Sequence, residues 1–534
     1  MDGLLIGAIP LAPALGGVLN LAGARLLGPR AAPLAVAAMV ISFACAVLAA
    51  ALVIAHGPIS LDPGRWTGLA GGLRADRLSV VMALLVTGIS LLVHAFAARA
   101  MQGDRHLARF FAGLNMVSAA VLMVALSGSL MLLFLFWMAK GYILALLLAH
   151  YSDRPASRRA ASKKMSIDLI GNTAFALAVV LVWHTFGTLD LAALAAQARG
   201  HAGDRLDLLG LHVAALTPIA LLLLVAAMAK SAQVPLHAWL PDSLETPTPV
   251  SALMHAGLVN AGGFLLVRLS PLFALSAPAM HLAFAVGTLT ALYGTAVMRT
   301  RSDVKGALAY STMGQMGFML MECGLGAFSL AILHLAAHGI FKATLFLGSG
   351  GAVAEGKMGR MLAGSGSQRA RTANRDATAA IASLLVVALA AILIDRAATQ
   401  GGAALLLLFA WTTGAGALAR AGGTGSLSHL AGGVPVLAAL GVAYFALVRG
   451  IAGFLAPVLP TAAIATAAAP GLGFVLPVAA LLLIVPAWRL RGPSRSPWLL
   501  RIERQFYVLA LHRGYGEELA GLVLSRPARR RARL

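Results

Sequence analysis

Apolar runs of about 18 to 25 residues recur along this 534-residue chain, and no other feature limits its fold as strongly. A run of that length crosses the ~30 Å hydrocarbon core of a bilayer as one α-helix. The composition agrees, because 60% of the residues are hydrophobic and only 11% are charged. A membrane β-barrel would show short alternating segments instead. The sequence therefore predicts an all-α polytopic membrane protein.

About 15 of these runs are predicted to be transmembrane helices. They are 3–24, 31–55, 78–98, 108–126, 129–150, 166–186, 211–234, 249–269, 279–298, 304–324, 327–350, 376–395, 402–419, 434–455 and 471–488. The first run follows an aspartate rather than a basic segment, so we expect a retained span and not a cleaved signal peptide. A basic amphipathic tail, 489–534, follows the last run.

The orientation of the spans follows from Lys and Arg in the connections. Five basic residues lie in 151–166, five in 355–376 and eleven in 489–534, all on one side of the membrane for this span count. Cytoplasmic loops carry such an excess. We therefore expect the N-terminus outside and the C-terminus in the cytoplasm. The same bias accounts for most of the net charge of +22 without nucleic-acid binding.

The segment KSAQVPLHAWLPDSLETPTPVSALMHAG (230–257) places ionisable groups and prolines directly after an apolar run. Broken backbone at membrane depth is tolerated only inside protein or beside a wet cavity. Lys230 and His255 are therefore candidate proton carriers. Ionisable side chains within a membrane are usually paired with another charge, face a water-filled cavity or take part in transport. The alternatives are an interfacial lysine that reaches toward water and a histidine satisfied in the core.

A second candidate relay is HLAAHGIFK, in which His334, His338 and Lys342 are spaced at i, i+4 and i+8. That spacing stacks them along one helix face, about 6 Å per step. Two histidines at i and i+4 also suit zinc, but neither a third ligand nor the glutamate of a HExxH motif is nearby. The row favours a hydrated proton pathway over a metal site.

Five further ionisable residues are candidate modulators of these carriers. Lys140 is the most deeply placed charge, Lys305 begins a span, and Glu322 lies late in the same span. The other two are Glu245, expected near Lys230 and His255, and Asp395, next to Arg396. Each has an interfacial or structural role as the alternative.

No motif for a cofactor or for catalysis is evident. The two cysteines, Cys45 and Cys323, lie in apolar runs and form no CxxC pair, and the glycine-rich stretch 348–356 lacks the lysine of a phosphate-binding loop. We therefore expect a transport subunit that is not an enzyme by itself.

Both relay segments, with SDVKGALAYSTMGQMGFM (302–319) and DRLSVVMALLVTGISLLVHAFAARAM (76–101), resemble the antiporter-like membrane subunits of respiratory complex I and of multisubunit sodium/proton antiporters. The resemblance implies two inverted five-helix repeats, each with a broken helix that carries a lysine. It implies that Lys230 is the first such lysine, that His255 is its relay histidine and that 334–342 forms the central relay. The implied regions are N-terminal helices (1–75), an antiporter-like core (76–425), C-terminal helices (426–488) and the tail (489–534).

The chain also departs from the family pattern. Met138 stands where the family has a glutamate that tunes the broken-helix lysine, with Lys140 two residues on. No lysine occurs in 376–395 or 402–419, and the tail takes the place of the long lateral helix of the complex I subunit.

LMHAGLVNAGGFLLVRLSP (253–271) and HYSDRPASRRAASKKM (150–165) resemble DabB-type membrane subunits of bacterial inorganic-carbon transporters. That branch implies a cation pathway, for H⁺ or Na⁺, which energises a soluble cytoplasmic DabA-like partner resembling a zinc β-carbonic anhydrase. Zinc would belong to the partner, and the tail would dock it. The alternatives are a respiratory or Mrp-type antiporter subunit and an inert membrane anchor.

Overall fold

The computed structural model describes residues 2–61, 72–208, 211–362, 427–461, 469–471 and positions 504, 505, 508 and 511. The long helices are α1 (Asp2–Ala22), α2 (Ala31–His56), α3 (Arg77–Ala100), α4 (Leu107–Leu126), α5 (Leu130–Leu148), α6 (Pro155–Phe186), α8 (Leu216–Lys230), α12 (Ala277–Met298), α13 (Val304–Gly324), α14 (Phe328–Leu362) and α17 (Leu427–Leu455). Shorter helical elements are η1 (Gly28–Arg30), α7 (Leu191–Gln197), η2 (Ser243–Glu245), α9 (Thr248–Leu253), the π-helical η3 (Met254–Leu258), α10 (Ala261–Arg268) and α11 (Ser270–Phe273). The strands are β1 (Ile59–Leu61), β2 (Leu73–Ala75), β3 (Arg205–Leu208) and β4 (Leu211–Ala214).

Ten helical stretches within these described ranges are long and apolar enough to cross a membrane. The all-α polytopic class is thereby confirmed. The predicted total of 15 spans is not confirmed, because 376–395, 402–419 and nearly all of 471–488 lie outside the described residues. The division of the chain into four regions stays a prediction.

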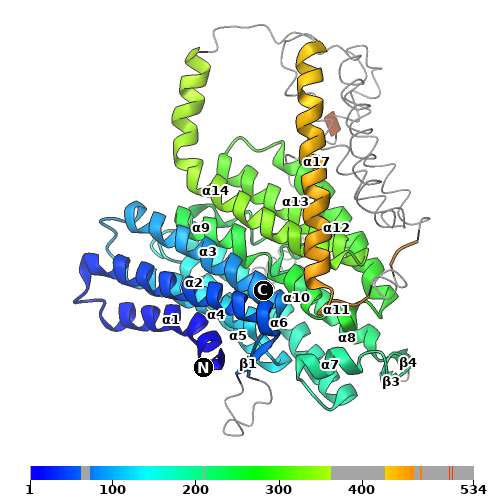
Figure 1. Cartoon of the computed structure of the whole chain (residues 1–534). Coiled ribbons are helices and arrows are strands. Elements are labelled where there is room, and N and C mark those ends of the chain that lie inside the picture. Colours follow the sequence, from blue (N-terminus) through cyan, green and yellow to red (C-terminus); the bar gives the residue numbers. More distant parts are fainter. Residues whose placement is uncertain are drawn as a thin grey trace, which may run out of the picture.

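The two antiparallel hairpins mark one end of the helix bundle. β1 pairs with β2 and β3 pairs with β4, and Figure 1 shows both hairpins at the end where α1 begins. Short connections make successive helices antiparallel, so the connections 23–30, 101–106 and 149–154 lie at the opposite end. The basic connections 23–30, 101–106 and 149–154 thus share one end of the bundle. Most of the predicted basic segments 355–376 and 489–534 lies outside the described residues.

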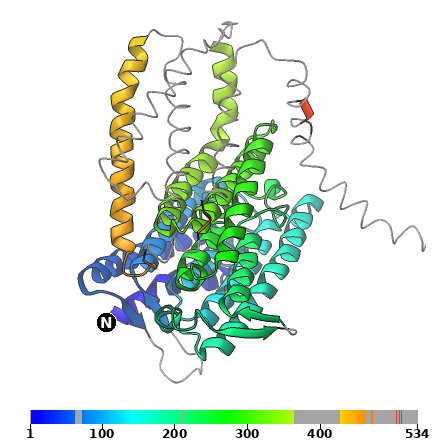
Figure 2. The same ribbon diagram turned by 90° about the vertical axis from the view of Figure 1, so that its right-hand side faces the viewer.

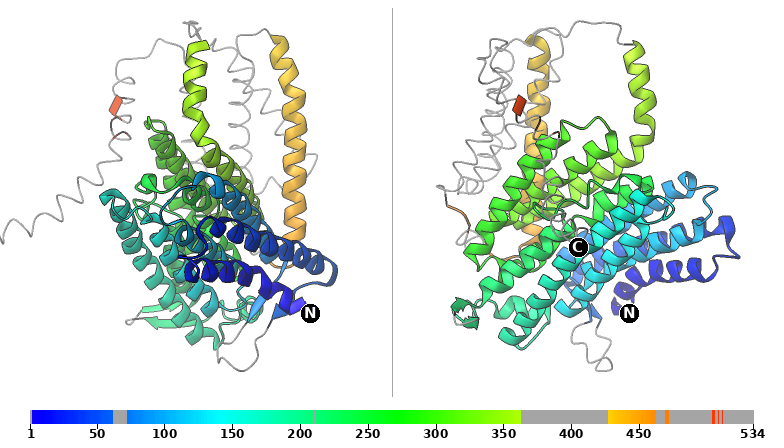
Figure 3. Two further views of the ribbon diagram at one scale, coloured as in Figure 1. Left: turned by 90° about the vertical axis from the view of Figure 1, so that its left-hand side faces the viewer. Right: turned by 180° about the vertical axis from the view of Figure 1, so that it is seen from behind.

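The outer helices frame a buried centre. Figure 3 shows α1 and α2 at one edge of the bundle, with α3 and α4 between them and the segment α8–α14. α12 and α13 pack closely, because Gly287 and Gly317 face each other's backbone where the helices meet. Figure 2 shows α17 standing at the margin, and the far part of α14 projecting beyond the bundle.

Two predicted boundaries were wrong. The basic segment 151–166 was expected to be a loop, but α6 begins at Pro155 and carries most of these residues as helix. Proline suits the first turn of a helix, where its missing N–H has no partner to lose. The predicted span 211–234 is a β strand followed by α8, which ends at Lys230.

Candidate ion-conducting site

The helix breaks immediately after Lys230, as the prolines predicted. α8 ends there, and the chain runs through turns and the short helix η2 until α9 begins at Thr248. Side chains of the broken segment form buried hydrogen bonds with nearby backbone carbonyls. The Ser231 hydroxyl donates to the carbonyl of Val259 at 2.6 Å, and the Trp239 indole donates to the carbonyl of Ala229 at 3.1 Å. Such bonds are required, because a buried unpaired carbonyl is costly in a water-free region.

Lys230 lies against a carboxylate that comes from α6. Its ammonium is 2.9 Å from Oδ2 of Asp168, and each side chain is only 3% exposed. Lys164, one turn earlier on α6, binds the same oxygen. The other oxygen of Asp168, Oδ1, is buried and has no hydrogen-bond partner among the described residues. One carboxylate therefore serves two buried lysines and keeps one acceptor free.

Lys140 joins this cluster from α5. The ammonium groups of Lys140 and Lys230 lie 4.4 Å and 5.7 Å from the centre of the Trp137 ring, so both contact the same indole. Gly141 allows the approach of α6 and α8, since a Cβ there would collide with the Lys230 ammonium and the Asp168 carboxylate. We call Lys140, Lys164, Asp168 and Lys230 the lysine–aspartate cluster.

His255 lies in the π-helical turn η3, beyond the break. Its ring stacks on Phe346 of α14, with centroids 4.4 Å apart and an interplanar angle of 10°. Nδ1 of this buried ring makes no hydrogen bond within the described part of the chain. A π turn leaves irregular backbone hydrogen bonds and is frequent at functional positions.

The 334–342 segment forms a second cluster along α14, as its spacing predicted. Nδ1 of His334 lies 3.1 Å from Oε2 of Glu322, and Nε2 lies 2.9 Å from Oε1 of Gln315, both on α13. The His338 ring is buried 6.3 Å from the His334 ring, and neither of its nitrogens has a partner in the described ranges. The Lys342 ammonium donates to the carbonyl of Leu308 at 3.3 Å.

The predicted modulators fall in different places. Glu322 is buried and pairs with His334. Glu245 is half exposed and binds Arg154 at 2.9 Å. Lys305 donates to the carbonyls of Leu244 and Thr246, at 3.4 Å and 3.1 Å, and so holds the backbone of the break. Asp395 lies outside the described residues.

Sequence reasoning missed the carboxylate and one lysine of the first cluster. Lys164 and Asp168 stand at i and i+4 on α6, but the basic run that includes Lys164 was read as a loop. Their spacing was the available signal, because such a pair at the start of an apolar run neutralises itself on a helix face. Gln315 was also missed, and a neutral amide gives no comparable signal.

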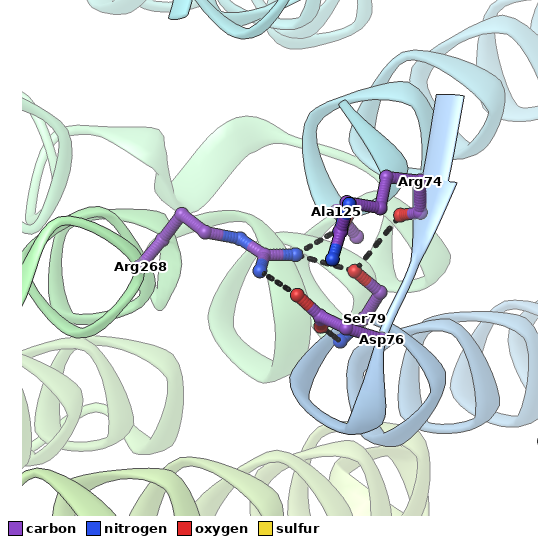
Figure 4. A network of polar contacts seen from close by, with 5 residues as sticks. All are labelled: Arg74, Asp76, Ser79, Ala125 and Arg268. Atoms are coloured by element: carbon purple, nitrogen blue, oxygen red, sulfur yellow. Dashed lines mark hydrogen bonds and ion pairs between the residues drawn. The ribbon is translucent and has the colours of Figure 1, made fainter. Parts of the chain in front are cut away.

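Another buried ion pair ties the break to the start of α3. Arg268 of α10 binds the carboxylate of Asp76 at 2.5 Å, contacts the Ser79 hydroxyl and donates to the carbonyl of Ala125 at 3.2 Å (Figure 4). Asp76 is also the N-cap of α3, accepting from the backbone N–H of Ser79. This network fixes α10, and with it the η3 turn, relative to α3 and α4.

The side chains of the two clusters are of the kinds that exchange protons. Within the described part of the chain, no group of three His, Cys, Asp or Glu side chains is placed to hold a metal ion. Buried lysines, histidines and carboxylates with free acceptors are the groups that proton relays in membranes use.

Comparison with known proteins places this geometry in a family context. The family model described as "NADH:quinone oxidoreductase/Mrp antiporter, TM" matches residues 127–419, and one described as "NADH-Ubiquinone oxidoreductase (complex I), chain 5 N-terminus" matches 68–111. The probable inorganic carbon transporter subunit DabB1 of Halothiobacillus neapolitanus is 43% identical over 352 residues, 65% of this chain and 62% of that protein. NADH-quinone oxidoreductase subunit L of Mycobacterium tuberculosis is 40% identical over 285 residues, 53% of this chain and 43% of that protein. The alignments thus cover less than two thirds of these relatives.

Two solved structures share the fold. A chain of the Mrp complex from Dietzia sp. DQ12-45-1b superposes with a TM-score of 0.59 at 23% identity, covering 99% of this chain and 59% of that one. A chain of the membrane-bound sulfane sulfur reductase, an archaeal respiratory membrane complex, superposes with a TM-score of 0.56 at 18% identity, covering 96% of each.

Proposed function

We propose that this chain, which belongs to the family of NADH:quinone oxidoreductase and Mrp antiporter membrane subunits, conducts protons through its two buried clusters to energise inorganic-carbon uptake by a partner. The observation that carries the proposal is the pair of clusters itself, on either side of the η3 turn. Lys230 is paired at one side, and His334, His338 and Lys342 line α14 at the other. His255 lies between them in sequence and contacts α14 through Phe346.

Proton transfer suits these side chains better than sodium transfer. Lysine and neutral histidine exchange protons, whereas sodium prefers several oxygen ligands. In the described ranges the buried carboxylates do not converge on one point, since Asp168 pairs with two lysines and Glu322 pairs with His334. The free atoms of Asp168, His255 and His338 are sites at which water would complete a hydrogen-bonded file.

The partner we propose is a soluble, DabA-like zinc protein of the carbonic-anhydrase type on the cytoplasmic side. Similarity to DabB1, and to the probable inorganic carbon transporter subunit DabB2 of the same organism at 40% identity, supports it. In this proposal the membrane chain is not an enzyme and holds no cofactor. It lies in the bacterial inner membrane with its N-terminus outside, and the basic tail 489–534 docks the partner.

Growth rescue tests the proposal. A carbonic-anhydrase-deficient bacterium would express this chain with and without the adjacent soluble protein, in air, with and without a protonophore. Rescue that needs both chains and disappears with the protonophore supports an ion-driven carbon pump. Failure with both proteins in the membrane fraction would contradict it.

The second candidate is a proton- or sodium-translocating subunit of a respiratory or Mrp-type complex. Identity of 40% to a subunit of NADH-quinone oxidoreductase favours it, over a shorter alignment than that with DabB1. Restoration of growth in an antiporter-deficient strain at high sodium, without the soluble protein, would select this candidate instead.

A further inference from the structure

The lysine–aspartate cluster contains more basic groups than acidic ones. Lys140, Lys164 and Lys230 come from three helices, and each is at most 3% exposed. Asp168 is the one carboxylate in the described part of the chain that acts on all three lysines. Three ammonium groups and one carboxylate would leave a net charge of +2 inside the bundle. A charge at membrane depth needs a partner or water, so the three lysines are not all expected to be charged together.

Two of the lysines already share the carboxylate. Lys164 binds Oδ2 of Asp168 from one turn away on α6, and Nζ of Lys230 lies 2.9 Å from the same oxygen. Both nitrogens therefore lie within ion-pair distance of a negative charge, which offsets part of the cost of removing an ammonium group from water. Lys164 and Lys230 are thus the members of the cluster that the carboxylate keeps charged.

Lys140 has no such partner. Within the described ranges its Nζ makes neither an ion pair nor a hydrogen bond, and it contacts the ring of Trp137 at 4.4 Å from the ring centre. The charged groups that face it are Lys230 of α8 and both Lys164 and Asp168 of α6. The two lysines repel a positive charge on Lys140, and only the shared carboxylate attracts one. An aromatic face attracts a cation as well, but it does not replace a counter-ion and the hydrogen bonds of water.

The same indole also contacts Lys230. Its Nζ lies 5.7 Å from the centre of the Trp137 ring, so Lys140 and Lys230 are two basic nitrogens on one aromatic side chain. Lys164 contacts a different ring, that of Trp239, at 4.9 Å. Lys230 is therefore the one lysine of the cluster that touches both the carboxylate and the indole on which Lys140 lies.

We propose that Lys140 is held as a neutral amine while Lys164 and Lys230 are charged, and that it accepts the proton that Lys230 releases. In this step an N–H bond of the Lys230 ammonium breaks, the lone pair of Lys140 forms a new N–H bond, and Lys230 becomes a neutral amine. The total charge of the cluster does not change. The carboxylate then pairs with Lys164 alone, and the Trp137 face stabilises the transient charge on Lys140. The neutral state of Lys140 is independent of the proposed function, whereas proton transfer to it rests on that function.

Nitrogen-15 NMR of the lysine side chains tests the neutral state directly, because an amine nitrogen and an ammonium nitrogen resonate at different frequencies. The sample is the purified complex with its soluble partner, in lipid at neutral pH, with the label in the lysine Nζ. The signal that Lys140→Met removes should be that of an amine. The signal that Lys163→Met removes should be that of an ammonium group, since Lys163 pairs with Asp242 at 2.7 Å. An ammonium signal for Lys140 would overturn the proposal.

Two substitutions at position 140 test the charge by thermal denaturation of the same complex. Lys140→Met keeps a long unbranched side chain that is neutral, so the transition temperature should remain that of the wild type. Lys140→Arg introduces a side chain that is always charged and should lower the transition temperature. A lowered transition temperature in Lys140→Met, or an unchanged one in Lys140→Arg, would refute the neutral state.

Proton flux into proteoliposomes of the same complex tests the transfer. Lys140→Met should slow flux about a hundredfold, the effect of losing a positioned proton carrier, although stability is kept. Lys163→Met is the matched control, because it removes a lysine outside the cluster and should conduct normally. Normal flux in Lys140→Met would refute the transfer. An amine signal for Lys140 in a wild-type complex that neither conducts protons nor rescues growth would keep the neutral lysine and reject the proposed function alone.

Discussion

The carboxylate of Asp168 on α6 and the ammonium of Lys230 on α8 lie 2.9 Å apart, both almost completely buried. The family pattern predicted this carboxylate on α5, at the position of Met138. Here α6 provides it, and α5 provides Lys140 beside the shared Trp137 ring. The broken-helix lysine therefore has a counter-ion, but from a different helix and in competition with Lys164.

Replacement of the shared carboxylate should abolish transport. Asp168→Asn leaves Lys164 and Lys230 without their counter-ion, and breaking a buried pair costs about 3–5 kcal/mol. We expect growth rescue to be lost and the thermal stability of the purified complex to fall. Asp168→Glu should restore part of both, and Asp153→Asn, on the exposed connection before α6, is the control. Wild-type rescue by Asp168→Asn would show that Lys230 does not depend on this pair.

Gly141→Ala should act on the same cluster without removing a charge. The added methyl group collides with the Lys230 ammonium and the Asp168 carboxylate, so the pair must separate. We expect proton flux to fall about tenfold, which corresponds to about 1.4 kcal/mol. Gly348→Ala on α14 adds the same group in open space and should conduct normally. Equal flux in the two variants would contradict the close approach at Gly141.

Glu322→Gln should impair the relay on α14. Glutamine keeps the size of the side chain but removes the charge that holds Nδ1 of His334. A charge-assisted hydrogen bond contributes about 1.5–3 kcal/mol, so flux should fall about tenfold or more. Glu245→Gln is the matched control, because Glu245 binds Arg154 at the surface, where an ion pair contributes about 0–1 kcal/mol. A larger effect at Glu245 than at Glu322 would reverse this assignment.

The Arg268–Asp76 pair should act mainly on stability. Asp76→Asn retains an N-cap for α3 but leaves Arg268 without its counter-ion, at a cost of about 3–5 kcal/mol. Asp190→Asn changes another N-cap aspartate, at the start of α7, and should cost less than about 1 kcal/mol. Thermal denaturation of the purified complex compares the two. Equal transition temperatures would show that the pair is not stabilising.

The sequence alone determined the features that depend on local pattern. Run length indicated membrane helices, proline spacing indicated the break after Lys230, and the i, i+4, i+8 spacing placed His334, His338 and Lys342 on one helix. The long motifs identified the family, which the family models confirmed. These properties follow from the thickness of a bilayer and the period of a helix, so neighbouring residues suffice to predict them.

Only the tertiary structure decided which charges meet. Asp168 reaches Lys230 because α6 and α8 pack together, with Gly171 against Ala229. Glu245, close to Lys230 in sequence, points instead to Arg154 at the surface. Helix packing sets the partner of a buried charge. A charge removed from water needs a counter-ion within a few ångströms, and that counter-ion can come from a helix far away in the sequence.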